Sequence, residues 1–295
     1  MKYRLLLFFL LFYRFSFSQT GMDAQFKIYD TKTKQVITID KIIADCANAN
    51  VLFFGEDHND SAGHYLEDTI FKTLYKAYGN NLALSMEMFE TDEQFVVNEY
   101  LEGFITEDRF SKDARAWSNY KDYRPLVEFA KQNNIPVIAA NAPRRYVNLV
   151  TRKGMKAVEG LPEESKKFLP PLPYDTATGR YYEKFTSLMS SGNGGPASGS
   201  PNLFQSQNLW DAGMSYSIYN YWKENKDQKI FHLCGRFHCD EKLGTLAQLQ
   251  KRKSKLKILN ISCFSDASFN NPDWENFSNL GDYIIITNPE LKKTF

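Results

Sequence analysis

The stretch VLFFGEDHND at residues 51–60 passes from four apolar residues through a glycine into two acids, a histidine, an amide and a further acid. A short, continuously apolar run is typical of a strand that is buried on both faces of a sheet. The polar residues begin where this strand ends, and ligands bind at that end of the strands in an open parallel sheet. The stretch therefore predicts a buried strand that delivers polar side chains to one sheet edge.

Further apolar runs also end in a small or polar residue. They are LALSM at 82–86, IPVIAAN at 135–141, KIFHLCG at 229–235, KLKILNIS at 255–262 and YIIIT at 283–287. Segments with helical spacing of apolar residues, such as 63–78 and 123–131, lie between the first three runs. This alternation predicts an α/β fold with a mostly parallel sheet flanked by helices.

The pattern changes between the third and fourth runs, where the chain shows helical spacing without strands. We expect helices near 145–153, 163–169, 176–190 and 203–224. We therefore divide the chain into an α/β core at 19–143 and 226–295 and an inserted helical subdomain at 144–225. Within the insertion, SSGNGGPASGSP at 190–201 is rich in Gly, Ser and Pro and predicts a flexible, exposed loop.

The overall charge of the chain does not indicate a polyanionic partner. Its 36 basic and 35 acidic residues give a formal net charge of +1. A balance of this kind argues against nucleic acid as a partner. Aromatic residues make up 15% of the chain, which is enough to line an apolar pocket as well as fill a core.

The N-terminal stretch MKYRLLLFFLLFYRFSFSQT has the pattern of a secretory signal peptide at residues 1–18. A short basic segment precedes an apolar run at 5–13, and small residues lie just before Gln19. The run is too short to span a bilayer. We expect an exported protein of the periplasm or cell envelope, with an uncleaved amphipathic anchor as the alternative.

The four cysteines are Cys46, Cys234, Cys239 and Cys263. No cysteine precedes Cys46, so the N-terminus offers no lipoprotein cysteine. Their spacing matches neither a zinc knuckle nor a redox pair, and we expect buried thiols, with one disulfide possible in an exported chain.

Polar side chains follow four of the predicted strands. After the first come Glu56, Asp57 and His58; after the second, Glu87; after the third, Asn141, Arg144 and Arg145; after the fourth, Arg236 and His238. Two of these strand ends share the motif Gly-x-x-His, as GEDH and GRFH. We expect each glycine to let the chain turn sharply and each histidine to point back over the sheet edge.

Two kinds of chemistry fit this set. Imidazole and carboxylate groups are ligands of divalent transition metals, which predicts a metal site at Glu56, His58, Glu87 and His238. The same four residues can act as general acid and base without a metal. An ordinary structural role is the alternative for the glutamates, because acids at strand ends also cap helices or pair with arginines such as Arg144.

Other residues near the same edge are candidates for ligand contacts. His64 follows His58 near the start of the next helix and can face the same cleft. Asn141 and Arg144 can orient a ligand or bind a carboxylate, although NAPRR is also a plausible turn before a helix. The chain has no Gly-rich phosphate loop and no Gly-x-Ser-x-Gly motif, which argues against kinases and serine hydrolases.

The order of these motifs resembles a known family. VLFFGEDHND, LALSMEMFETDEQFVVNEYLEG, YRPLVEFAKQNNIPVIAANAPR and LCGRFHCD, which span roughly residues 38–265, are similar to the ChaN-like haem-binding uptake family. That family lies in a superfamily with Tiki, TraB-type and erythromycin-esterase-like proteins. The resemblance implies an α/β core with a helical subdomain, and an exported bacterial protein of haem or iron acquisition whose paired subunits can hold two haems face to face.

The resemblance leaves two functions open. In the first, the chain carries or stores haem, with His58, His64, Tyr65, Asn141, Arg144, Tyr146 and His238 as the candidate contacts. Tyr181 and Tyr182 are further candidates for the iron ligand. The implied partners are a second subunit and outer-membrane uptake components. In the second, a divalent metal held by Glu56, His58, Glu87 and His238 activates water for hydrolysis. A scaffold without catalytic activity is the third possibility.

Overall fold

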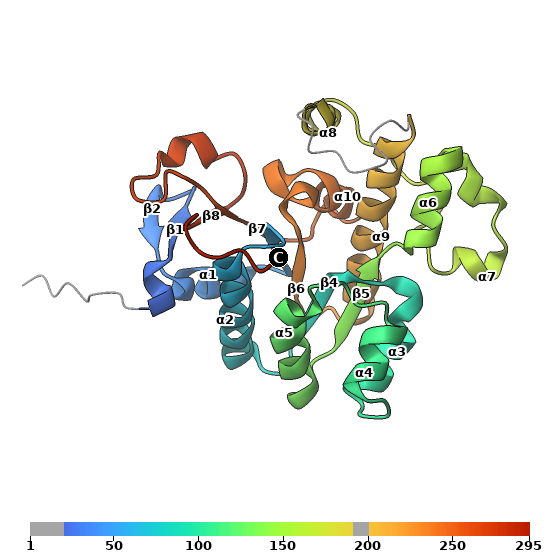
Figure 1. Cartoon of the computed structure of the whole chain (residues 1–295), viewed down its shortest axis with the longest axis horizontal. Coiled ribbons are helices and arrows are strands. Elements are labelled where there is room, and N and C mark those ends of the chain that lie inside the picture. Colours follow the sequence, from blue (N-terminus) through green and yellow to red (C-terminus); the bar gives the residue numbers. More distant parts are fainter. Residues whose placement is uncertain (1–20, 191–200) are drawn as a thin grey trace, which may run out of the picture.

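The computed structural model describes residues 21–190 and 201–295. Eight strands form one sheet in the order β2-β1-β8-β7-β3-β6-β4-β5, with helices on both faces (Figure 1). The strands are β1 (Phe26–Asp30), β2 (Gln35–Ile37), β3 (Val51–Glu56), β4 (Leu82–Glu90), β5 (Val137–Asn141), β6 (Lys229–Gly235), β7 (Ile258–Ser265) and β8 (Tyr283–Thr287). All pairings from β8 to β5 are parallel, which confirms the mostly parallel α/β sheet.

The two N-terminal strands were not predicted. β1 pairs antiparallel with both β2 and β8 at one edge of the sheet. Both strands are partly exposed, and FKIYD mixes polar with apolar residues. They lack the continuous apolar run that a strand buried on both faces requires, so apolar patterning does not predict them.

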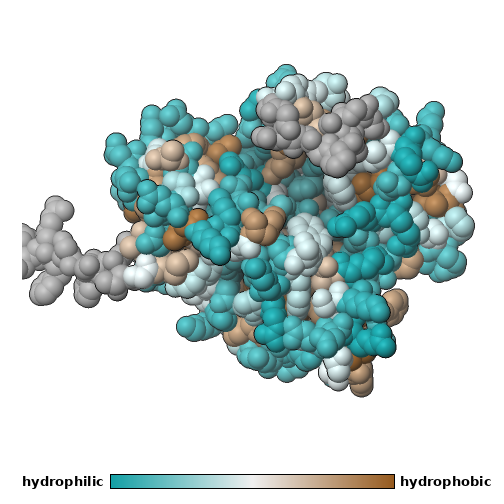
Figure 2. All heavy atoms as spheres, viewed as in Figure 1, coloured by the Kyte–Doolittle hydropathy of each residue, from teal (hydrophilic) through white to brown (hydrophobic). Residues whose placement is uncertain are grey.

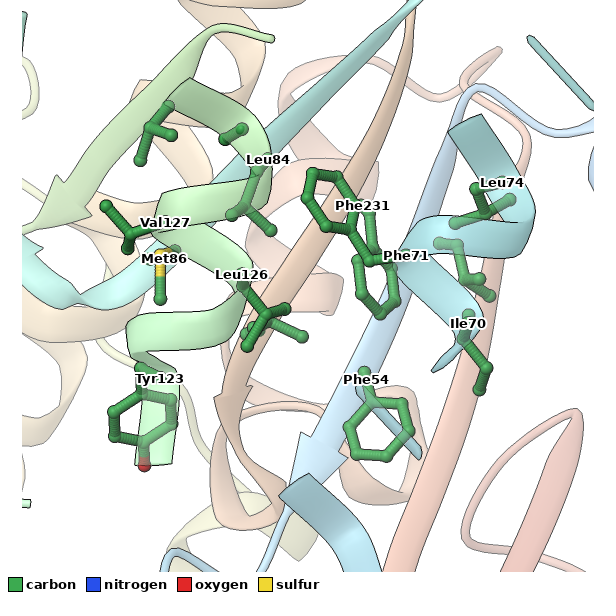
Figure 3. Packing of buried hydrophobic residues seen from close by; sticks show 14 of the residues in the cluster. Phe54, Ile70, Phe71, Leu74, Leu84, Met86, Tyr123, Leu126, Val127 and Phe231 are labelled. Atoms are coloured by element: carbon green, nitrogen blue, oxygen red, sulfur yellow. The ribbon is translucent and has the colours of Figure 1, made fainter. Parts of the chain in front are cut away.

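The strands of the sheet centre bury alternate side chains on opposite faces. Leu52 and Phe54 of β3 and Phe231 of β6 join a core with α2 (Ser61–Tyr78) and α5 (Tyr120–Gln132) on one face (Figure 3). Val51 and Phe53 of β3 join a second core with α9 (Leu203–Glu224) and α10 (Gly244–Arg252) on the other face. Helices therefore cover both faces, and the strand ends remain for polar chemistry.

The remaining helices complete the two layers and the segment between β5 and β6. α1 (Ile39–Asp45), α3 (Gln94–Leu101) and α4 (Glu107–Asp113) precede β5; α6 (Arg144–Lys153), α7 (Glu163–Lys166) and α8 (Arg180–Ser190) follow it, together with α9. These four follow the helical spacing expected from 145 to 224. The division into a core and an inserted subdomain stays a prediction.

Two predicted features lie outside the described residues. They are the signal peptide at 1–18 and the flexible loop at 190–201, apart from Ser190 and Pro201. Among the described residues, no helix has an apolar stretch long enough to cross a bilayer. The face shown in Figure 2 is mostly hydrophilic, with apolar residues in small groups. All four cysteines are buried and free, in line with the expectation of buried thiols.

Candidate functional site

The two Gly-x-x-His motifs meet at the carboxyl edge of the sheet. β3 and β6 are parallel neighbours, and their register pairs Glu56 with Gly235. His58 follows the end of β3, and His238 closes the short helix Arg236–His238 that follows β6. β4 lies on the other side of β6 and contributes Glu87 to the same edge. The structure thus brings all four of these residues together: Glu56, His58, Glu87 and His238.

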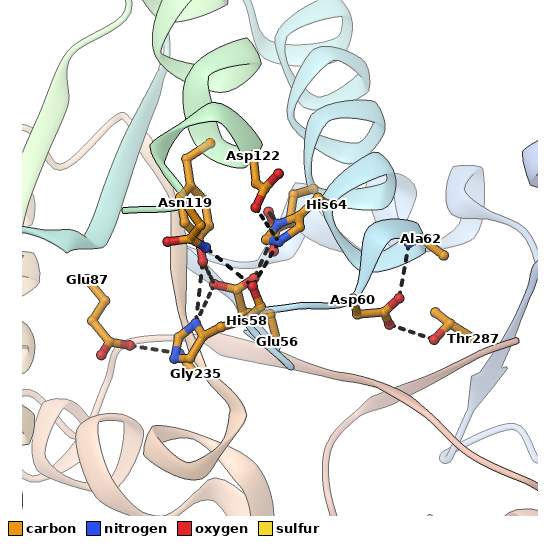
Figure 4. A network of polar contacts seen from close by, with 12 residues as sticks. Glu56, His58, Asp60, Ala62, His64, Glu87, Asn119, Asp122, Gly235 and Thr287 are labelled. Atoms are coloured by element: carbon orange, nitrogen blue, oxygen red, sulfur yellow. Dashed lines mark hydrogen bonds and ion pairs between the residues drawn. The ribbon is translucent and has the colours of Figure 1, made fainter. Parts of the chain in front are cut away.

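Glu56 orients His58. The Oε1 atom of Glu56 lies 2.9 Å from Nδ1 of His58 and also accepts a hydrogen bond of 2.7 Å from the hydroxyl of Tyr123 on α5 (Figure 4). Glu56 and Tyr123 are buried. The ring of Trp117 packs edge-on against the imidazole of His58 at 5.1 Å between centroids. Tyrosine, carboxylate and histidine therefore form one fixed chain of contacts.

Asp211 orients His238 in the same way. Its Oδ1 atom lies 2.7 Å from Nδ1 of His238, and its Oδ2 atom accepts a 2.7 Å hydrogen bond from the hydroxyl of Tyr181. Thr245 donates a further hydrogen bond to Oδ1, and Asp211 is completely buried on α9. The site therefore contains the Tyr–carboxylate–His arrangement twice, built from different helices.

In both arrangements the second imidazole nitrogen points away from the orienting carboxylate. A carboxylate at Nδ1 favours a proton on that nitrogen, which fixes the ring and turns Nε2 toward the site. Nε2 of His238 lies 3.5 Å from Oε1 of Glu87. The other oxygen of Glu87 accepts the backbone N–H of Gly235 at 2.7 Å, and Nε2 of His58 lies against the same glycine.

The buried carboxylates favour the charged form of both imidazoles. Burial lowers the pKa of His58, but the hydrogen bond and charge of Glu56 outweigh it and raise this pKa to about 9. Burial likewise opposes the charged form of His238, and the charges of Glu87 and Asp211 outweigh it, so its pKa is also raised. Burial and the charge of Glu67 raise the pKa of Glu56 to about 8.

The glycines of the two motifs have a different role from the one we expected. Neither Gly55 nor Gly235 has a positive φ, so neither is needed for a sharp turn. A Cβ atom at Gly235 would lie 2.8 Å from Nε2 of His58, and one at Gly55 would lie 2.4 Å from Sγ of Cys239. The glycines provide space for close contact between the two strand ends.

A pocket of about 430 Å³ opens beside Glu87. Its lining is Glu87, Glu90, Trp117, Asn141, Arg144, Val147, Asn148, Thr151, Leu203, Ser206 and Trp210. Two indole rings and two aliphatic side chains supply apolar surface, and a few polar groups lie among them. This volume and composition are typical of a small-molecule or cofactor site. Asn141 and Arg144, which we expected near the ligand, both line it.

A family model described as haem-binding uptake, Tiki superfamily, ChaN matches residues 42–249. The chain belongs to this ChaN family. A solved structure of ChaN of Campylobacter jejuni, described as cofacial heme binding to that protein, superposes with a TM-score of 0.67 at 19% identity, over 90% of this chain and 97% of that one. The ChaN fold predicted from the sequence motifs is therefore confirmed.

Two further matches of this ChaN-family chain to known proteins are weaker. An erythromycin esterase in its open conformation has a TM-score of 0.49 at 10% identity, over 90% of this chain and 83% of that one. Protein RETICULATA-RELATED 5, a chloroplastic protein of Arabidopsis thaliana, is 24% identical over 151 residues, which is 49% of this chain. The chain spans only 20% of the length of that curated relative.

Several tyrosines that we predicted as ligand contacts do not line the pocket beside Glu87. Tyr65 lies beside Phe26 and directs its hydroxyl to Asp23, away from the pocket lining. Tyr146 is buried and accepts a hydrogen bond from Arg145. Tyr182 on α8 is half exposed and packs against Phe204. Helix position rather than sequence proximity decides these placements, because neighbouring residues on a helix face different directions.

The metal ligands of the predicted set do not converge on one point. A metal site needs at least three ligand atoms close together. Among residues 21–190 and 201–295, the side chains whose ligand atoms all lie within 4.8 Å of one another are Glu56, His64 and Glu67. His64 turns its ring into this buried cluster instead of the pocket. Glu87 lines the pocket, and His58 and His238 lie against its indole rings, but the three do not close into such a group.

Sequence reasoning missed the residues that orient the histidines and line the pocket. They are Glu67, Trp117, Tyr123, Trp210 and Asp211. One signal was present for Glu67, since His64 and Glu67 are three apart on a helix and share a face. Another was present for Asp211, a lone acid within the largely buried helical stretch SQNLWDAGMS.

Proposed function

We propose that the chain binds haem in the pocket beside Glu87. The observation that carries this proposal is the pocket itself, which is lined by the indole rings of Trp117 and Trp210, with His58 packed against the first of them. Porphyrin is a large aromatic plane that is held by apolar and aromatic side chains, while its iron takes a histidine or tyrosine ligand. Membership of a haem-binding uptake family supports the same ligand.

His58 is the candidate for the iron ligand. Its side chain is 35% exposed, against 9% for His238, and it packs on Trp117 of the pocket lining. Among the described residues, no tyrosine lines this pocket. The hydroxyl of Tyr181 is already bonded to Asp211. Iron takes the place of the proton on Nε2, while Glu56 keeps the proton on Nδ1 and fixes the ring.

Arg144 is the candidate partner of the haem propionates. It lines the pocket at the start of α6, and its side chain is 70% exposed. Its nearest acid is Glu90, at 3.8 Å, so the guanidinium has donors free for a carboxylate ligand. Asn141 lies beside it in the lining and adds an amide donor.

The proposal also includes export to the periplasm or cell envelope and pairing of two subunits, with outer-membrane uptake components as partners. The signal-like N-terminal sequence supports export. ChaN of Campylobacter jejuni is described as binding heme cofacially, and two copies of this chain are proposed to bring two haems together in the same manner.

A haem titration followed by absorption spectroscopy tests the proposal. We expect a Soret band that saturates in the wild-type chain, and a shifted band with roughly tenfold weaker affinity in the His58→Ala variant. Tyr65→Phe, away from the pocket, is the matched control and should bind as the wild type does. If the Soret band and the haem affinity of His58→Ala equalled those of the wild type, His58 would be ruled out as the iron ligand. A wild-type chain without a Soret band would overturn haem binding.

A further inference from the structure

A second polar cluster, also buried, lies next to the first Tyr–carboxylate–His arrangement. Nδ1 of His64 lies 3.0 Å from Oε2 of Glu67 and 3.4 Å from Oε2 of Glu56. His64 and Glu67 share a face of α2, and Glu56 ends β3 beside them (Figure 4 shows His64 and Glu56). Glu67 is 0% exposed and Glu56 is 2% exposed. Three potential metal ligands therefore meet away from solvent.

Two carboxylate oxygens of this cluster have no hydrogen-bond partner within the described part of the chain. They are Oε2 of Glu56 and Oε1 of Glu67. A buried oxygen without a partner costs about 1–3 kcal/mol, and more when it is charged. Oδ2 of Asp122, also without a partner, lies 3.9 Å from Nε2 of His64 and adds negative charge nearby. These two oxygens of the cluster thus lack a positive or donating partner.

The far side of His64 shows how its imidazole is oriented. Nε2 lies 3.1 Å from the backbone carbonyl oxygen of His58. A carbonyl oxygen only accepts hydrogen bonds, so Nε2 carries the proton. In the neutral imidazole, Nδ1 then presents a lone pair to two carboxylates. Histidines that ligate metals have this arrangement, with the other ring N–H donated to a backbone carbonyl.

We propose that Glu56, His64 and Glu67 bind a divalent first-row transition-metal ion such as Zn²⁺ or Mn²⁺. The donor set is one imidazole nitrogen and two carboxylates, which suits these ions. Ca²⁺ takes six to eight oxygen ligands and Mg²⁺ retains several waters, so a small buried site with a nitrogen donor disfavours both. The ion satisfies the two unpartnered oxygens and balances the buried charge.

This site is separate from the haem pocket and does not rest on haem binding. Glu56 alone belongs to both, with Oε1 toward His58 and Tyr123 and Oε2 toward His64. His64 and Glu67 do not line the pocket. The ion therefore serves to hold Glu56, and through it His58, in place.

Metal binding to the untagged full chain tests the proposal. The protein is stripped with a chelator, equilibrated with Zn²⁺ or Mn²⁺, dialysed and analysed by mass spectrometry of the metal. We expect a stoichiometric ion in the wild type and affinity roughly tenfold weaker or more in Glu67→Gln, which keeps the side-chain shape and removes the charge. Glu87→Gln is the matched control, because Glu87 lies at the pocket edge, and it should retain the ion.

The melting temperature of each variant, measured with and without metal, separates loss of metal binding from loss of folding. Without metal, Glu67→Gln should melt at or above the wild-type temperature, since the amide can donate to the unpartnered oxygen of Glu56. Added Zn²⁺ should raise the melting temperature of the wild type and of Glu87→Gln, but not of Glu67→Gln. His64→Gln should behave as Glu67→Gln does.

Three outcomes would overturn the proposal. They are a wild type that takes up no metal, a Glu67→Gln variant that retains a stoichiometric ion, and loss of the ion in Glu87→Gln with retention in Glu67→Gln. The first would mean that a proton shared between Glu56 and Glu67 occupies the cluster. Haem is titrated into both the metal-free and the metal-loaded samples. A Soret band at either metal content supports haem binding whatever the metal analysis gives, so failure of one proposal is distinguishable from failure of the other.

Discussion

The Oε1 atom of Glu87 lies 3.5 Å from Nε2 of His238, and both residues are buried at the carboxyl edge of the sheet. On the other side of the same imidazole, Nδ1 lies 2.7 Å from Asp211. The charges of these two carboxylates outweigh the cost of burial and raise the pKa of His238.

Glu87→Gln should lower the pKa of His238, by roughly one unit or more, because one of the two neighbouring charges is removed. Proton NMR titration of the imidazole resonances measures this directly, and the chain has only 4 histidines to assign. Glu163→Gln, on the exposed helix α7, is the control and should leave the titration unchanged. An unchanged His238 titration in Glu87→Gln would show that Asp211 alone sets its charge.

The raised pKa of His238 makes part of the stability of the fold dependent on pH. This contribution is fully present below the unfolded pKa of about 6.5 and is lost as the pH rises through the higher folded value. His58 contributes in the same direction, with a folded pKa of about 9.

Urea unfolding of metal-free protein between about pH 6 and pH 9 should show a falling free energy of unfolding, with a shallower fall in His238→Gln. Parallel curves for the two proteins would contradict a folded-state shift at His238.

His58 and His238 are expected to act on one ligand. Each single change to alanine should weaken haem affinity, and the double variant should lose less than the sum of the two losses, since the first change already breaks the site. Folding should survive in all three proteins, which circular dichroism checks. Strictly additive losses would indicate two independent roles.

Gly235→Ala should disturb the site through steric contact alone. The added methyl group would lie 2.8 Å from Nε2 of His58, so the ring must move. We expect a loss of about 1–3 kcal/mol in unfolding free energy and weaker haem binding. Gly160→Ala is the matched control, because a Cβ at that position meets nothing within 4 Å. Equal behaviour of the two variants would show that His58 tolerates displacement.

Export is tested by mass spectrometry of the mature protein from its native compartment. The N-terminal sequence predicts removal of about 18 residues without an added lipid. Leu7→Arg, which interrupts the apolar run, should leave the precursor uncleaved. A mature chain that begins at Met1, or one that carries lipid, would contradict the signal-peptide assignment.

Much of the fold was predictable because strands buried on both faces need uninterrupted apolar sequence. The runs that end at Gly55 before Glu56, at Met86 before Glu87, and at Gly235 marked β3, β4 and β6. The parallel arrangement then put their ends at one edge. The partly exposed strands β1 and β2 carry no such run. Their position depends on pairing with β8 at the far end of the chain.

The sequence by itself determined that Glu56, His58, Glu87 and His238 share one edge of a parallel sheet, because strand direction and strand ends follow from local apolar patterning. Only the tertiary structure decided what each side chain faces. Asp211 reaches His238 because α9 packs closely along β5, where Gly213 leaves no room for a Cβ against Ala142. Glu56 divides its two oxygens between His58 and His64 because α5 and α2 approach β3 from the same face. Such contacts depend on packing between distant segments, which the period of a single strand or helix does not encode.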